Sequence, residues 1–171
     1  MIKGLNNPKT AAYIELKNRV CSADFPWYFI PKTTHNKTEN DLSWFCHTCL
    51  ERPERDGNGY SVPTSPYCPQ TVSVVREILQ ANGIELFTML RACFNMTTPQ
   101  LDVARSVEHI DHDVPHQNLI IYLNDCDGDT VVEGESVSPE EDKVILLNGS
   151  HYIKTPTIKE RVVLVATFIA Y

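Results

Sequence analysis

Apolar residues recur along this chain with a helical period in the first half and with a strand-like alternation in the second. The clearest helix is predicted for residues 69–82, where Pro69 stands at the start, Gly83 follows the end, and four apolar residues share one face. These residues are Val74, Val75, Ile78 and Leu79. Residues 8–19 predict a shorter helix with Pro8 in its first turn.

Two aromatic segments between these helices predict strands. Residues 25–30 (F-P-W-Y-F-I) have the composition of a buried strand, and residues 42–50 (L-S-W-F-C-H-T-C-L) predict another. Residues 31–41 are polar and predict a loop. Residues 51–68 contain three prolines and two glycines before Pro69 and predict a surface excursion.

From residue 84 onward, short apolar strands alternate with turn residues. The strands are predicted at residues 84–96, 119–124, 129–133, 143–148 and 161–171. Turn pairs such as Asp127-Gly128 and Asn148-Gly149 separate them. Helices in front and many short strands behind predict a mainly β protein with N-terminal helices, folded as a jelly roll.

Composition places the chain among soluble globular proteins of one domain. The 171 residues suit a single domain, with N-terminal helical and strand support at about 1–84 and a core barrel at about 85–171. The net charge of −7 argues against non-specific nucleic-acid binding, which needs a basic face. No secretory signal and no long apolar run is visible, so the six cysteines are expected to be reduced thiols in a cytoplasm, the host's if the protein is viral.

The candidate chemistry is concentrated after residue 107. In an extended backbone His109 and Asp111 point to the same face, because side chains two positions apart do so. His151 follows a later apolar strand. Two histidines and one carboxylate are the protein ligands of the facial triad that holds non-haem Fe(II) and leaves other positions open. A metal site at the mouth of a barrel is therefore predicted.

Other donors stand close to this dyad. His112 and Asp113 lack the one-residue gap, and His116 follows a proline in a predicted turn. We interpret these three side chains as a solvated loop, with a role beside the metal ligands or toward a substrate as the alternative.

Arg161 opens the last predicted strand, 161–171, both of whose faces are largely apolar. A guanidinium at the head of a buried strand needs a partner, because its desolvation without one is costly. Its planar fork matches a carboxylate in a bidentate manner. That carboxylate belongs either to one of the 22 acids of the chain or to a ligand.

Several pieces in this order resemble the 2-oxoglutarate and Fe(II)-dependent oxygenases. They are His109-x-Asp111, Tyr122-Leu123-Asn124, Asp127-Gly128-Asp129-Thr130, His151 and Arg161, preceded by the segment Phe25–Tyr28. The resemblance is to the prolyl-4-hydroxylase-like branch, particularly to small members from marine phages. It covers most of the chain, loosely before residue 85 and well from about residue 105 onward.

The resemblance implies a double-stranded β-helix, the cupin-like jelly roll, with Fe(II) held by His109, Asp111 and His151. It also implies that 2-oxoglutarate is the cosubstrate, with its distal carboxylate on Arg161 and the hydroxyl of Tyr122. The implied activity is that of a dioxygenase, which uses O2 and decarboxylates 2-oxoglutarate to succinate while a substrate is hydroxylated. No other catalytic residue beyond the metal ligands is implied.

Two further functions stay open at this point. One is a non-catalytic, cupin-like barrel that binds a metal or a small anion. The other is an interaction module with zinc at Cys46, Cys49 and Cys68, although a strand would turn Cys46 and Cys49 to opposite faces. The primary substrate also stays open: peptidyl proline, another side chain, a free amino acid, a nucleobase or a metabolite. The loops 31–41 and 51–68 are expected to shape its site.

Overall fold

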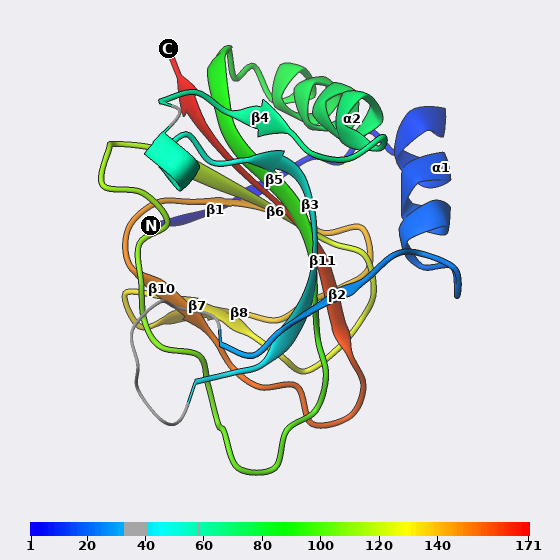
Figure 1. Cartoon of the computed structure of the whole chain (residues 1–171), viewed down its shortest axis with the longest axis vertical. Coiled ribbons are helices and arrows are strands. Elements are labelled where there is room, and N and C mark those ends of the chain that lie inside the picture. Colours follow the sequence, from blue (N-terminus) through cyan, green and yellow to red (C-terminus); the bar gives the residue numbers. More distant parts are fainter. Residues whose placement is uncertain (33–40, 58) are drawn as a thin grey trace.

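Two antiparallel sheets face each other in the computed structural model, which describes residues 1–32, 41–57 and 59–171 (Figure 1). The larger sheet contains β1 (Ile2–Leu5), β2 (Tyr28–Ile30), β3 (Trp44–Glu51), β4 (Val62–Pro63), β5 (Leu86–Thr97), β6 (Gln117–Tyr122), β9 (Val144–Leu147) and β11 (Arg161–Ala170). The smaller sheet contains β7 (Thr130–Val132), β8 (Glu135–Val137) and β10 (His151–Ile153). The predicted mainly β jelly roll is confirmed.

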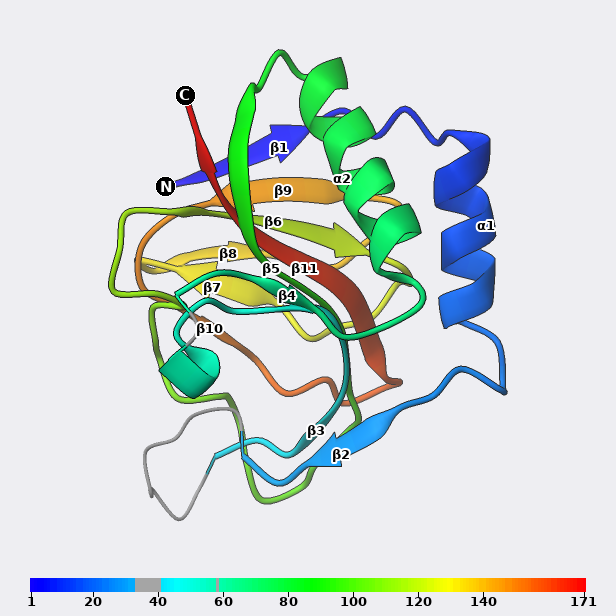
Figure 2. The same ribbon diagram turned by 45° about the horizontal axis from the view of Figure 1, so that its top comes forward.

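Two helices cover the outer face of the larger sheet, α1 (Ala11–Val20) and α2 (Cys68–Ala81) (Figures 1 and 2). The prediction for α2 is confirmed, and Gly83 behind it adopts a positive φ of 68°. The prediction that Pro8 lies in the first turn of α1 is wrong. The helix begins after Thr10, whose hydroxyl accepts a hydrogen bond from the backbone N–H of Tyr13. No helix in the described ranges is long and apolar enough to cross a membrane.

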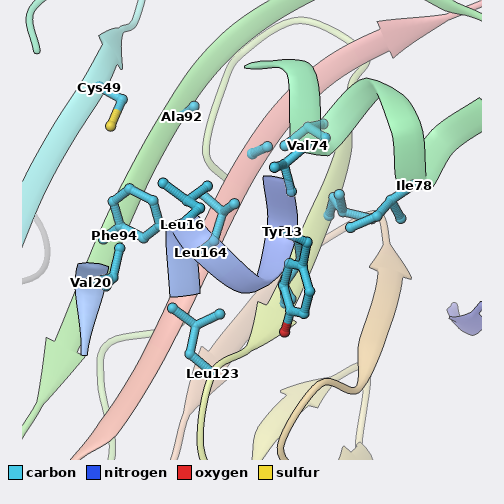
Figure 3. Packing of buried hydrophobic residues seen from close by; sticks show 14 of the residues in the cluster. Tyr13, Leu16, Val20, Cys49, Val74, Ile78, Ala92, Phe94, Leu123 and Leu164 are labelled. Carbon is cyan, nitrogen blue, oxygen red and sulfur yellow. The ribbon is translucent and has the colours of Figure 1, made fainter. Parts of the chain in front are cut away.

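The core lies between the helices and this outer face. Figure 3 shows side chains of both helices meeting those of β5 and β11, and nearly all of them are inaccessible to solvent. The labelled residues include Tyr13, Leu16, Val74, Ile78, Phe94 and Leu164. Each large apolar side chain buried in this way contributes about 1.5–3 kcal/mol. The packing fixes the larger sheet as a rigid wall for whatever lies on its other face.

The strand β11 runs through the middle of the larger sheet between β5 and β6, in the order β1-β9-β6-β11-β5-β3-β2. Both of its faces are buried, as predicted. Its inner face points toward the smaller sheet and aligns Arg161 with Thr97 and Thr167 with Arg91 of β5. The inner face therefore carries polar and charged residues at these positions, beside an apolar cluster that includes Ile120, Val132 and Val163.

The segment 25–30 differs from its prediction as a buried strand. Only residues 28–30 form β2, and Tyr28 and Phe29 are 62% and 59% exposed because β2 is the edge strand of the sheet. Most of the predicted loop 31–41 lies outside the described residues, since 33–40 are not described. The same holds for Asn58 in the predicted excursion 51–68. The division into a support of about 1–84 and a barrel of about 85–171 stays a prediction.

Candidate metal centre

His109 and His151 are directly opposite each other across an isolated antiparallel bridge. The backbone N–H of each residue donates to the carbonyl oxygen of the other, at 3.0 and 2.9 Å, and the two imidazole rings lie 4.7 Å apart. Asp111 follows His109 by two positions. One ligand atom from each of the three side chains lies within 4.8 Å of the other two. The structure therefore brings together the three residues predicted to hold a metal.

Backbone carbonyls fix the tautomer of both imidazoles. The Nδ1 atom of His109 lies 3.0 Å from the carbonyl oxygen of Val107, and that of His151 lies 3.2 Å from the carbonyl oxygen of Gly149. A carbonyl oxygen only accepts, so Nδ1 carries the proton in each ring. The lone pair of each Nε2 is thus available, which is the arrangement usual for histidines that bind a metal.

Asp111 is the buried acid of this group. Its Oδ2 accepts a hydrogen bond from Asn118 at 2.8 Å and lies 3.5 Å from Nε2 of His151. Burial would raise the pKa of this carboxyl, but the nearby charge of Arg91 and the two histidines outweigh it and hold the pKa at about 2. Burial lowers the pKa of His151. The group therefore presents an ionised carboxylate and a neutral imidazole near pH 7.

His112 is buried, which contradicts its interpretation as part of a solvated loop. Its Nδ1 donates to the carboxylate of Glu54 at 2.8 Å, and its Nε2 accepts from the hydroxyl of Thr167 at 2.7 Å. Both nitrogen atoms are occupied, so His112 fastens the segment after Asp111 to β11. Asp113 is exposed, and the ring of His116 packs on that of His112.

Arg161 is 2% exposed at the head of β11, and its hydrogen-bond partners among the described residues are neutral groups. Its Nε donates to the carbonyl oxygen of Gly128 at 2.9 Å, and its Nη2 donates to the hydroxyl of Thr130 at 2.8 Å. Tyr122 donates to the same hydroxyl at 2.7 Å. In the described ranges no carboxylate lies within ion-pair distance of Arg161, so the alternative of an acid from the chain itself finds no support there.

A second polar feature lies on the same inner face. Thr97 is opposite Arg161 in the sheet register, and its buried hydroxyl has no hydrogen-bond partner among the described residues. Asn95, two residues earlier on β5, likewise has a buried side-chain oxygen that accepts no hydrogen bond from the part of the chain that the structure describes. A guanidinium without an acid, the Tyr122 and Thr130 hydroxyls and an unpaired Thr97 hydroxyl are a set of donors that fits a carboxylate. Sequence reasoning found Arg161 and Tyr122 but missed Thr130 and Thr97.

The cysteines of the Cys46-His47-Thr48-Cys49 segment do not gather a metal site. Cys46, Cys49 and Cys68 are free and buried, and His47 is occupied by the carbonyl of Pro26 and the hydroxyl of Ser65. Within the part of the chain that is described, His109, Asp111 and His151 form the one group of three such donors close enough to share an ion. The zinc-module alternative is therefore without structural support.

Comparison with known proteins finds similarity in structure but not in sequence. No protein-family model matches the chain. No curated protein matches it either. Solved structures with a similar fold include a 2OG-Fe(II) oxygenase family oxidoreductase from Burkholderia pseudomallei, with a TM-score of 0.64, 12% identity, and coverage of 94% of this chain and 83% of that one.

Two hydroxylases are similar to the same extent. A Pseudomonas putida prolyl-4-hydroxylase gives a TM-score of 0.58 at 15% identity, covering 98% of this chain and 91% of that one. A Trichoplax adhaerens prolyl hydroxylase was solved in complex with a hypoxia inducible factor oxygen degradation domain peptide fragment. It gives a TM-score of 0.62 at 13% identity, covering 98% of this chain and 83% of that one. At such identities the likeness concerns the fold, the double-stranded β-helix.

Proposed function

We propose that this protein is an Fe(II)- and 2-oxoglutarate-dependent dioxygenase that hydroxylates a substrate. The observation that carries the proposal is the convergence of His109, Asp111 and His151, with both imidazoles held in the Nδ1–H tautomer by backbone carbonyls. Two imidazoles and one carboxylate leave coordination positions open, as the facial triad of non-haem iron oxygenases requires. The fold shared with solved 2OG-Fe(II) oxygenases supports the same conclusion.

Each part of the inner face has a role in this proposal. His109 and His151 offer Nε2, Asp111 offers a carboxylate oxygen, and Asn118 orients that carboxylate through its 2.8 Å hydrogen bond. When bound, iron and 2-oxoglutarate supply the oxidising chemistry, in which O2 is consumed and succinate and CO2 are released.

The distal carboxylate of 2-oxoglutarate is assigned to Arg161, with the hydroxyl of Tyr122 as a second donor. A charged, bidentate contact satisfies the guanidinium, which has no acid partner in the described ranges. To donate to this carboxylate, the single hydroxyl hydrogen of Tyr122 would turn away from Thr130, to which it donates in the structure, while Thr130 still accepts from Nη2 of Arg161. This pocket fixes the position of the cosubstrate relative to the metal ligands.

The chemical class of the substrate stays open. Peptidyl proline or another protein side chain is one candidate, because two of the similar structures are prolyl hydroxylases. A free amino acid, a nucleobase and a metabolite are the others. The cysteines in the described ranges are free, which suits a reducing compartment such as the cytoplasm.

The test begins with the purified protein, ferrous iron and 2-oxoglutarate without oxygen. We expect a weak visible charge-transfer band under these conditions and slow release of succinate when oxygen is admitted. His109→Ala and Asp111→Ala should each abolish the release, by at least about a hundredfold, because a ligand of the metal is lost. Succinate is measured by mass spectrometry.

A matched control is His116→Ala. It removes an imidazole from the segment between Asp111 and β6 and leaves the three proposed ligands in place. It should retain succinate release. Continued turnover in both His109→Ala and Asp111→Ala would remove the dyad from the mechanism. Metal binding without the band and without succinate would favour the second candidate, a cupin-like barrel that binds a metal or a small anion.

A further inference from the structure

Arg91 is a buried guanidinium that makes no hydrogen bond to any described residue. It lies on the inner face of β5, its side chain is 12% exposed, and its Nε is completely buried without a partner. Its nearest acid is Asp111, where Nη1 lies 3.6 Å from Oδ1, beyond ordinary hydrogen-bond length. A buried guanidinium normally has its planar fork filled by acceptors. The fork of Arg91 is therefore unfilled beside the candidate metal centre.

Arg52 adds a second guanidinium on the same side of Asp111. Its Nη1 donates to the backbone carbonyl of Asp111 at 2.9 Å, and its Nη2 lies 3.9 Å from Oδ1. The Arg52 side chain is 30% exposed, so this pair of arginines extends from the interior toward solvent.

The acids around the two arginines are engaged with other groups. Glu51 pairs with Arg55 at 2.7 Å, Glu54 with His112 at 2.8 Å, and Asp111 accepts from Asn118 on its other oxygen. None of these carboxylates forms the bidentate contact that an arginine fork matches best. The acceptor missing from Arg91 must therefore come from outside the described residues.

From this arrangement we infer that the primary substrate carries a carboxylate, which binds the fork of Arg91 with Arg52 as a second donor. The inference rests on the proposed function and narrows its substrate to small carboxylic acids, free amino acids among them. The carboxylate of the substrate would then lie next to Asp111. This position brings the carbon skeleton of the substrate close to the metal. Arg91 and Arg52 are substrate-binding residues in this scheme.

Two other roles for Arg91 are separated by the test. Arg91 could serve only to hold the carboxylate of Asp111, or its counter-charge could come from Cys46, a buried neighbour on β3. The first role predicts no preference among substrates. The second predicts that Cys46→Ser behaves like a substitution of Arg91.

The experiment measures succinate release above the uncoupled rate at saturating iron and 2-oxoglutarate. The probes are the twenty free L-amino acids and a series of small carboxylic acids, each paired with its own carboxamide. We expect acids to stimulate release at concentrations about tenfold or more below those of the matched amides, because a charge-assisted bidentate contact distinguishes them. The ratio of the two KM values is the readout.

Variants then assign the preference to residues. Arg91→Gln should bring the ratio of the KM values close to one, and Arg91→Lys should retain part of the ratio. Arg52→Gln should reduce the ratio less than Arg91→Gln does, because the Arg52 side chain is the more exposed of the two. The exposed Arg76→Gln on α2 and Cys46→Ser should leave the ratio as in the wild type.

Equal stimulation by acids and amides, stimulation by neither, or a ratio that survives both Arg91→Gln and Arg52→Gln overturns the inference. A wild-type protein with no charge-transfer band and no uncoupled succinate overturns the proposed function instead, and the inference with it. A band with uncoupled succinate but without acid preference overturns the inference alone.

Discussion

Gly128 lies against the aliphatic part of the Arg161 side chain. This close approach requires a glycine at position 128. A Cβ at this position would lie 3.1 Å from Cδ of Arg161 and 3.1 Å from the carbonyl oxygen of Lys154. Contacts this short require the neighbours to shift. Because Nε of Arg161 donates to the carbonyl oxygen of Gly128 itself, a shift there moves the guanidinium.

We therefore expect Gly128→Ala to raise the KM for 2-oxoglutarate by about tenfold and to lower stability by about 1 kcal/mol, as overpacking does. Steady-state succinate release and thermal unfolding measure the two effects. Gly4→Ala is the control, because a Cβ there meets nothing within 4 Å. An unchanged KM in Gly128→Ala would mean that Arg161 does not anchor the cosubstrate.

The sequence predicted that His109, Asp111 and His151 lie together, as the structure shows, better than it predicted their neighbours, while their role as ligands and that of Arg161 as an anchor stay proposals. His109 and Asp111 could be found because a spacing of two is readable in one segment. Thr130 could not be, because its contact comes from another strand, and Asn118 could not be, because it reaches from β6 back to Asp111 in the preceding loop. His112 was misjudged for the same reason: its partners, Glu54 and Thr167, are far from it in sequence.

At the scale of elements, Asp142 fastens α1 to the sheet. Its Oδ1 accepts hydrogen bonds from Tyr13 and Lys17, both at 2.6 Å, and its Oδ2 pairs with Lys9 at 2.8 Å. Its backbone N–H donates to the carbonyl oxygen of Tyr122 at 2.9 Å. Although burial would raise the pKa of this carboxyl, the hydrogen bonds from Lys17, Lys9 and Tyr13 hold it at about 2.

A carboxyl whose pKa is lower in the folded than in the unfolded state stabilises the fold above the unfolded value and loses that effect as the pH falls. Stability from Asp142 should thus be complete above pH 3.8 and disappear toward pH 2. We expect Asp142→Asn to cost about 1 kcal/mol at pH 7 and to flatten the loss of stability between pH 4 and pH 2.

Urea unfolding as a function of pH checks this expectation, and the exposed Asp102→Asn is the control. An acid limb that is as steep in Asp142→Asn as in the wild type would contradict the role of the carboxylate. Asparagine is the suitable replacement because residue 142 has a positive φ of 67°, which asparagine tolerates.

The long elements were predicted from the sequence, as were the short apolar strands β7 and β9, whereas β1, β8 and β10 were not. The helix α2 and the strands β5 and β11 each show many repeats of one period. By contrast, β1, β8 and β10 have four, three and three residues, too few for an alternation to be recognised. Strand β2 was assigned the wrong environment, since aromatic composition does not distinguish a central strand from an edge strand.

For the molecule as a whole, the order of helices and strands was enough to predict the jelly roll. Short antiparallel strands with turns between them have few stable arrangements, and two facing layers bury their apolar sides. What the sequence could not provide is the register of the larger sheet, which sets Arg91, Thr97 and Arg161 on one wall. Those alignments depend on packing between strands that are distant along the chain.

The bridge between His109 and His151 lies at the end of a short contact between two stretches, which are also joined by the bridge of Arg105 and Lys154 and by the hydrogen bond from the N–H of Ser106 to the carbonyl oxygen of Ile153. An ion held by both rings would act as a removable cross-link, closed by the cation and opened by a chelator. At a cation concentration about 100 times Kd, local opening should fall about a hundredfold. Trypsin should accordingly cut after Arg105 more slowly with Zn(II) than with EDTA, while cutting after Lys9 proceeds alike in both. The same centre that is proposed to carry out oxidation would then also decide how long this side of the roll survives a protease.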